Sequence, residues 1–83
     1  MKFNRDLQRL KNAKSGYNSA IDIIASKVQS VCDFEIYLDD VPGDGWCFGS
    51  DVNGSPLYMS MSSVIEVVEK TGKFTKDDWE PFG

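Results

Sequence analysis

The chain has 83 residues, of which 41% are apolar and 27% charged, and its formal net charge is −4. This length fits one small domain with a thin core, and an aromatic content of 12% excludes a disordered segment. The sequence contains no histidine, which removes the commonest general base and the commonest transition-metal ligand.

A first helix is predicted over residues 3–14, where three apolar side chains recur at helical spacing, namely Phe3, Leu7 and Leu10. The run Lys14-Ser15-Gly16 is typical of a helix stop or kink. A second helix is predicted to begin near Ser19, because Ser19 and Asp22 have the spacing of a capping box. The apolar stripe of this helix consists of Ile21, Ile24, Val28 and Val31.

From residue 32 the helical period gives way to the two-residue period of strands. Residues 32–38 alternate between apolar and polar side chains and predict a half-buried first strand. Residues 46–48 and 56–60 predict the second and third strands. The connections carry turn signals, Val41-Pro42-Gly43-Asp44 and then Asn53-Gly54, the second being typical of a tight hairpin.

A third helix is predicted to start near Ser62 or Ser63, with a capping box formed by Ser63 and Glu66, and to end at Gly72. A last short turn is predicted from Thr75, Asp78, Trp79 and Phe82.

The element order α-α-β-β-β-α predicts an α+β fold, in which helices pack on a three-stranded antiparallel meander. We expect a single small domain over residues 1–83, made of a basic helical part (1–31), an acidic meander (32–60), and a helix with a C-terminal turn (61–83). The start of the sequence lacks the apolar stretch of a signal peptide, and no apolar run is long enough to cross a membrane, so we expect a cytoplasmic protein.

The turns also predict the strand register. A loop over residues 41–44 pairs Leu38 with Cys47, and an Asn53-Gly54 loop pairs Phe48 with Met59. One face of the sheet then carries Phe34, Ile36, Leu38, Cys47 and Tyr58. The other carries Tyr37, Trp46, Phe48, Leu57, Met59 and Met61, mixed with Asp33, Glu35 and Asp39. Both faces are therefore apolar, so either helices cover both or one is left for a partner or a second copy.

Two cysteines without histidine make neither a disulfide scaffold nor a structural zinc site. The expected register separates Cys32 from Cys47 by about 20 Å at roughly 3.3 Å per residue, so no bond between them is expected. Residues 43–48, Gly-Asp-Gly-Trp-Cys-Phe, resemble the box around the nucleophile of OTU-type cysteine proteases. No histidine exists to deprotonate Cys47 and its neighbours are acidic, so we interpret the segment as a turn followed by a strand and expect no enzyme.

Charge is distributed unevenly along the chain. Residues 1–31 hold six basic and two acidic side chains, a balance of +4, whereas residues 32–83 hold three basic and eleven acidic ones, a balance of −8. The basic segment suggests a nucleic-acid element built from Lys2, Arg5, Arg9 and Lys11. The acidic remainder of the chain would repel a polyanion, which makes nucleic acid the alternative partner rather than the first.

These observations together favour a small acidic, non-enzymatic protein that binds a macromolecular partner, namely a basic protein surface, as an inhibitor or adaptor. Phage anti-defence proteins, including anti-CRISPR inhibitors, provide an analogy at the level of the class only. A homodimer is the other protein partner considered, and no metal, cofactor or membrane is expected. The expected partner-binding residues are Tyr37, Asp39, Asp40, Asp44, Trp46, Phe48, Met59 and Met61.

Overall fold

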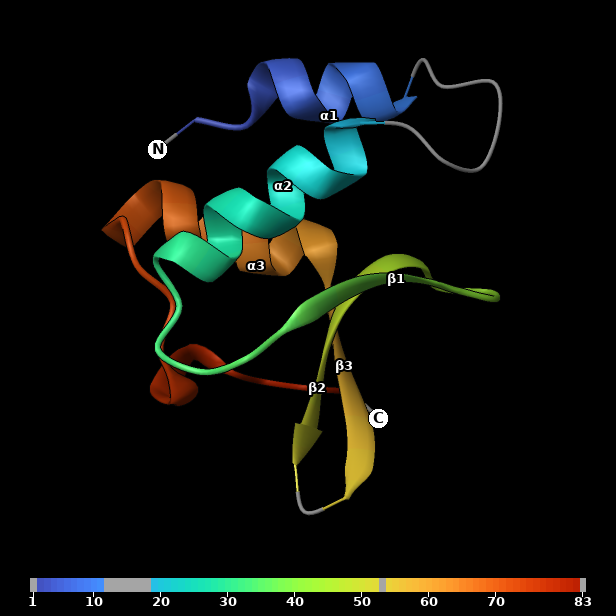
Figure 1. Cartoon of the computed structure of the whole chain (residues 1–83), viewed down its shortest axis with the longest axis vertical. Coiled ribbons are helices and arrows are strands. Elements are labelled where there is room, and N and C mark those ends of the chain that lie inside the picture. The colour runs from blue at the N-terminus through green and yellow to red at the C-terminus, as the bar shows by residue number, and fades with distance from the viewer. Residues whose placement is uncertain (1, 12–18, 53, 83) are drawn as a thin grey trace.

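Three helices and one three-stranded antiparallel sheet follow one another in the order α-α-β-β-β-α, as the sequence predicts (Figure 1). The structure is a computed structural model that describes residues 2–11, 19–52 and 54–82. The predicted stop at residues 14–16, the side chain of Ser19 and the turn residue Asn53 lie outside these ranges. The elements are α1 (Asn4–Lys11), α2 (Ser19–Ser30), β1 (Tyr37–Val41), β2 (Gly45–Val52), β3 (Ser55–Ser60), α3 (Met61–Thr71) and the 3-10 turn η1 (Lys76–Asp78).

The predicted C-terminal signals of the helical parts are confirmed. Gly72 ends α3 in the left-handed conformation, with φ of 77°, and its N–H donates to the carbonyl of Val68 over 2.8 Å. Thr75 and Asp78 form the predicted capping box around η1. The predicted box at Ser63 is wrong, because α3 already begins at Met61, directly after β3.

The first strand begins later than its alternating pattern predicts. Residues 33–36 lie outside the sheet, because their backbone groups bond elsewhere. The side-chain amide of Gln29 on α2 donates to the carbonyl of Phe34 over 2.9 Å and accepts the N–H of Ile36 over 3.0 Å. Cys32 forms a parallel bridge with Phe74 beyond α3. The alternation of apolar and polar residues therefore extends over residues 32–36, whose backbone groups bond α2 and the segment around Phe74 instead of a neighbouring strand.

The register between β2 and β3 is as predicted, with Phe48 opposite Met59, but the register between β1 and β2 is shifted by one residue. Leu38 lies opposite Phe48 rather than Cys47. The cause is the turn, in which three residues rather than four connect the strands. Asp44 donates its N–H to the Val41 carbonyl over 3.0 Å, and Gly43 has φ of 87° after Pro42, the residue pattern of a type II turn.

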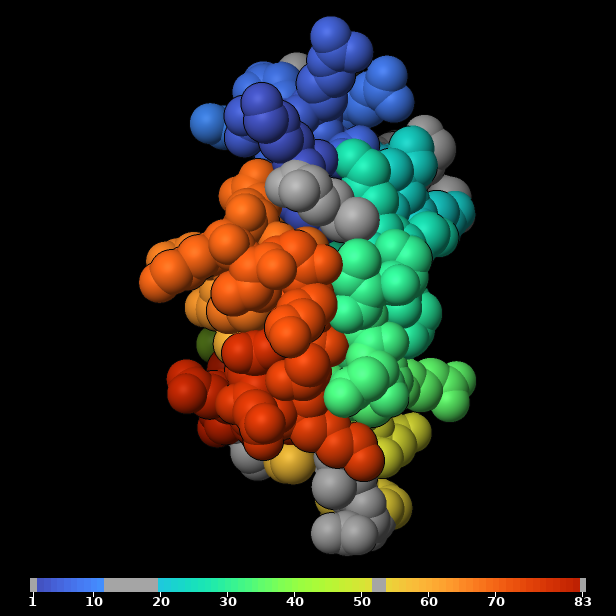
Figure 2. Space-filling view, turned by 90° about the vertical axis from the view of Figure 1, so that its left-hand side faces the viewer, coloured from blue at the N-terminus to red at the C-terminus, as the bar shows by residue number. Residues whose placement is uncertain are grey.

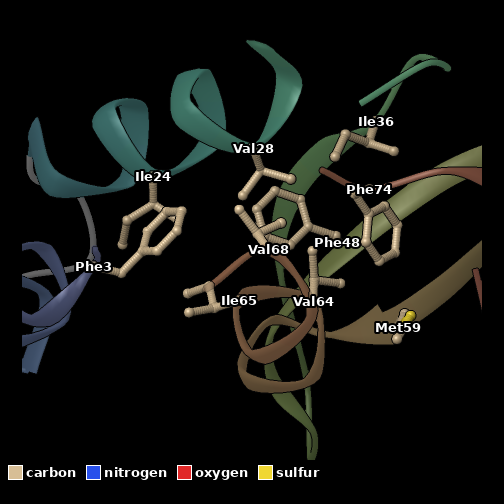
Figure 3. Close-up of a cluster of buried hydrophobic side chains, with 10 residues drawn as sticks. All are labelled: Phe3, Ile24, Val28, Ile36, Phe48, Met59, Val64, Ile65, Val68 and Phe74. Carbon is tan, nitrogen blue, oxygen red and sulfur yellow. The ribbon is translucent and has the colours of Figure 1, made fainter. Parts of the chain in front are cut away.

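This shift decides which side chains form the core, because one residue of register moves every side chain of a strand to the other face. Leu38, Phe48 and Met59 share the face on which α2 and α3 pack. Figure 3 shows Phe48 and Met59 among the core side chains of these helices. Figure 2 shows α2 and α3 side by side, with α1 across one end of the pair. Ten buried residues make up the core: Phe3, Ile24, Val28, Ile36, Phe48, Met59, Val64, Ile65, Val68 and Phe74.

Candidate protein-binding face

The opposite face of the sheet carries aromatic and acidic side chains, and no described helix covers it. Strand alternation and the observed register place Tyr37, Gly49 and Tyr58 in one row across the three strands. Asp39 follows Tyr37 on β1, and Asp51 follows Gly49 on β2. We call this surface the acidic face and define it by Glu35, Tyr37, Asp39, Asp51 and Tyr58.

Two tyrosine rings lie over a glycine at the centre of the acidic face. The rings of Tyr37 and Tyr58 meet edge to face, with their centroids 6.4 Å apart. A Cβ atom on Gly49 would lie 2.7 Å from Cε2 of Tyr37 and 2.9 Å from Cε1 of Tyr58. Only glycine leaves room for both rings, and because the rings cover it, Gly49 is itself buried.

Each tyrosine hydroxyl reaches a carboxylate of the acidic face. The hydroxyl of Tyr37 donates to Asp51 Oδ1 over 3.3 Å, and that of Tyr58 donates to Asp39 Oδ2 over 3.5 Å. Desolvation, together with neighbouring Tyr58 and Asp51, raises the pKa of Tyr37 to about 12. The hydroxyl of Tyr37 is therefore protonated at neutral pH and acts as a donor to Asp51.

Beside Tyr37 the acidic face is hollowed. Glu35, Ile36, Tyr37 and Asp51 line a cavity of about 180 Å³. Two carboxylates and the ring of a tyrosine are groups that attract the charged end of a lysine or arginine side chain, through ion pairing and cation–π contact. The hollow therefore has the lining that a basic side chain of a partner requires.

No described lysine or arginine forms an ion pair with this surface. Between Lys27 and Lys70 the sequence contains no lysine or arginine, so all three strands lack basic residues. Within the described ranges the one ion pair joins Lys27 to Asp6, with its nitrogen and oxygen 2.6 Å apart, on the helical side of the molecule. Among the described residues, the carboxylates of Asp39 and Asp51 accept hydrogen bonds from tyrosine hydroxyls and from the Asp40 N–H, and from no cation.

The structure separates the residues that the sequence predicts to bind a partner. Phe48 is 0% exposed and Met59 is 6% exposed, so both belong to the core and the predicted exposed cluster is wrong. Trp46 and Met61 are half-buried, and Met61 is the first residue of α3 rather than a strand residue. The reason is that the shifted register places Leu38 rather than Tyr37 on the face of Phe48, and this apolar face packs against the helices.

Four of the predicted residues remain on the surface. Tyr37 is 37% exposed and belongs to the acidic face together with exposed Asp39. Asp40 and Asp44 are exposed at the end of β1 and in the turn that follows. Tyr58, Asp51 and Glu35 were not predicted as site residues.

The signal that finds these residues is the register. Once Tyr37 is paired with Gly49, alternation alone brings Tyr58 and Asp51 to its side.

Cys47 is a buried free thiol close to carboxylates. It is 0% exposed, and burial together with the carboxylates of Asp44, Asp39 and Asp40 raises the pKa of its thiol. Burial also raises the pKa of Cys32, and both cysteines are free. Over the described ranges, no group of three or more acidic or cysteine side chains is placed to hold a metal ion.

The basic residues of the N-terminal part gather at a second site. Lys2, Arg5 and Arg9 line a cavity of about 340 Å³ with Asp6 and Lys27. Lys27 is already engaged there, because its amino group bonds Asp6 and the carbonyl of Lys2 and lies 5.3 Å from the centre of the Phe3 ring. The predicted alternative residue Lys11 is exposed at the end of α1, outside this cavity.

Comparison with family models, with curated proteins and with solved structures finds no match to this chain. In the part of the chain that the structure describes, no helix has the length and apolar character needed to cross a membrane.

Proposed function

We propose that this chain is a non-enzymatic binding protein whose acidic face binds a basic surface of another protein. The observation that carries the proposal is a sheet face that no described helix covers, on which two tyrosines are fixed over Gly49 among carboxylates that no described cation neutralises. Such a surface supports binding in two ways. Its charge steers a basic partner towards it, and fixed tyrosine rings supply contact area at little cost in conformational entropy.

Binding of this kind is typical of inhibitors and adaptors, which act by occupying a surface rather than by transforming a substrate. The raised pKa of Cys47 and its complete burial agree with such a role. A partner surface that normally holds nucleic acid has the required positive charge and is the class of partner that we propose.

The proposal is tested with a twelve-residue peptide of six lysines and six serines, titrated into ¹⁵N-labelled protein. We expect the largest amide shifts at the acidic face. The variant Asp39→Asn/Asp51→Asn should weaken binding about fivefold, since each exposed charge pair contributes about 0.2–1 kcal/mol.

The matched control removes the same charge elsewhere. Glu66→Gln/Asp77→Asn neutralises two exposed carboxylates, one on α3 and one on η1. If both double variants weaken binding equally, the peptide responds only to net charge and the acidic face is not a site.

The basic cavity formed by Lys2, Arg5 and Arg9 favours a second candidate function, binding of nucleic acid. Phosphate contacts by these side chains would make duplex DNA binding steeply salt-dependent. A gel-shift assay with a 20-base-pair duplex at low salt decides between the two. A shift that Arg5→Ala/Arg9→Ala abolishes would support this candidate, whereas no shift at protein concentrations that saturate the lysine peptide would support the acidic face.

A further inference from the structure

The two edges of the sheet differ in what lies beside them. The sheet order is β1-β2-β3, so β1 and β3 are its edges. The outer edge of β3 receives the C-terminal segment, because Phe82 donates its N–H to the carbonyl of Tyr58 over 2.8 Å. Within the described ranges no strand or bridge pairs with the outer side of β1. An open edge presents a row of backbone donors and acceptors to which another chain can bond.

The hydrogen bonds around β1 show which residues present these groups. In an antiparallel pair, successive residues point their N–H and C=O alternately towards the neighbouring strand and away from it. Ile36 donates its N–H to Gln29 on α2, and Asp40 donates its N–H to the Asp39 carboxylate over 2.9 Å, so the even-numbered residues point outward. Leu38 lies between them with its N–H and C=O outward.

On either side of Leu38, side chains already bond the outward backbone groups, as the backbone of a neighbouring strand would. The amide of Gln29 accepts from Ile36 and donates to Phe34, which is what the backbone of a paired strand would do. Asp39 Oδ1 takes the position of a carbonyl opposite Asp40. Leu38 itself is half-buried and has no such substitute among the described side chains.

A groove lined by residues of both elements lies between α2 and β1. Its volume is about 520 Å³. Its aliphatic lining comes from Ile21 and Ala25 on α2, and from Ile36 and Leu38 at and just before β1. Ile36 and Leu38 place the groove on the core side of the sheet, Tyr37 contributes to its rim, and Asp39 points to the acidic face. A strand added to β1 would therefore place every second side chain at the groove and the others beside the acidic face.

We propose that the outer edge of β1 binds an extended segment of a partner protein with alternating apolar and basic residues, which adds to the sheet as a fourth strand. Its backbone bonds Leu38 and replaces the Asp39 carboxylate at the Asp40 N–H. Its apolar side chains enter the groove, and its basic side chains lie beside Asp39 and Tyr37. This inference rests on the proposed function, since it names the segment of the basic partner that the protein recognises.

Charge argues against a second copy of the chain as the occupant. Pairing β1 with β1 of another copy about Leu38 would make the Asp39 carboxylates of the two copies diagonal neighbours on one face, and like charges brought together in this way destabilise a sheet. A basic strand meets the same carboxylates with opposite charge. Charge complementarity therefore selects the partner over self-association.

The probe is a nine-residue peptide of alternating lysine and valine, beginning and ending with lysine. Two further peptides carry backbone N-methyl groups, one on every valine and the other on the internal lysines. Only one of the two sets of N–H groups can face β1, so one methylated peptide should bind at least tenfold more weakly than the parent and the other within about twofold. Titration into ¹⁵N-labelled protein measures the affinities, and slowed exchange of the Leu38 amide locates the strand.

A pair of protein variants tests the edge from the other side. Asp40→Ala removes the charge and keeps the outward N–H, whereas Asp40→Pro also removes the N–H without breaking a bond to β2. Proline should weaken parent-peptide binding at least tenfold beyond alanine. If the proline variant fails to fold, the methylated peptides still decide.

Three results would overturn the edge proposal. They are absence of parent-peptide binding at millimolar concentration, equal binding of all three peptides, or a concentration-dependent dimer of the protein alone with a protected Leu38 amide. Equal binding of the three peptides, combined with a loss in Asp39→Asn/Asp51→Asn, would leave the acidic face as the site and remove only strand addition. Loss of that charge dependence would remove the proposed function instead.

Discussion

Gly49→Ala tests whether the tyrosine pair is seated as the structure shows. The new Cβ atom would lie 2.7 Å from Tyr37 and 2.9 Å from Tyr58, closer than carbon atoms approach, so both rings must move. Their movement removes an edge-to-face contact of about 0.5–1.5 kcal/mol and weakens two hydroxyl bonds to carboxylates, roughly 2 kcal/mol in total. Alanine is better than glycine in a strand by about 0.5–1 kcal/mol, and Gly49 has no positive φ that would oppose it.

The net expectation is a loss of about 1 kcal/mol in the free energy of unfolding. Urea denaturation followed by circular dichroism measures it, and with a slope of about 1 kcal/mol/M the midpoint should fall by about 1 M. The sign must reverse when the rings are absent. In a Tyr37→Ala/Tyr58→Ala background, Gly49→Ala should stabilise the protein by about 0.5 kcal/mol. If it stabilises the wild-type protein as well, the rings do not lie over Gly49 and the acidic face is built differently.

Three further predictions follow from the same geometry. Phe48→Ala should cost about 3–5 kcal/mol of stability, a large part of what a domain of this size has, so thermal unfolding rather than binding should report it. The raised pKa of Tyr37, about 12 against an ordinary 10, means that the folded state holds this proton more tightly. Its contribution to stability is complete below about pH 10 and is lost as the pH rises to about 12. Unfolding of wild type and Tyr37→Phe across this interval should show a larger loss in wild type, since the raised pKa values of the two cysteines act in both proteins. The buried Cys47 should react with a thiol reagent only on unfolding, while half-buried Cys32 reacts first, and fast modification of Cys47 in the native protein would contradict its burial.

The order of the elements and their type follow from local patterns. The stripe of Ile21, Ile24 and Val28 is buried on α2 as its spacing predicts, and Gly72 ends α3 where the sequence places the stop. The hairpin signal Asn53-Gly54 predicts the register of β2 with β3, because a two-residue turn fixes which residues face one another. These features depend on neighbours within a few positions in the chain, so a single sequence is sufficient to predict them.

The assignment of side chains to faces needed the tertiary structure. Alternation correctly groups Tyr37 with Asp39 and Phe48 with Trp46, but it does not say which group meets which across the first hairpin. Because the turn is one residue shorter than expected, Leu38 lies opposite Phe48 in the core and Tyr37 lies opposite Gly49 on the other face. The binding face is therefore a consequence of register and helix packing, both of which join residues that are distant in sequence, whereas the acidic charge that the face displays was already evident in the sequence.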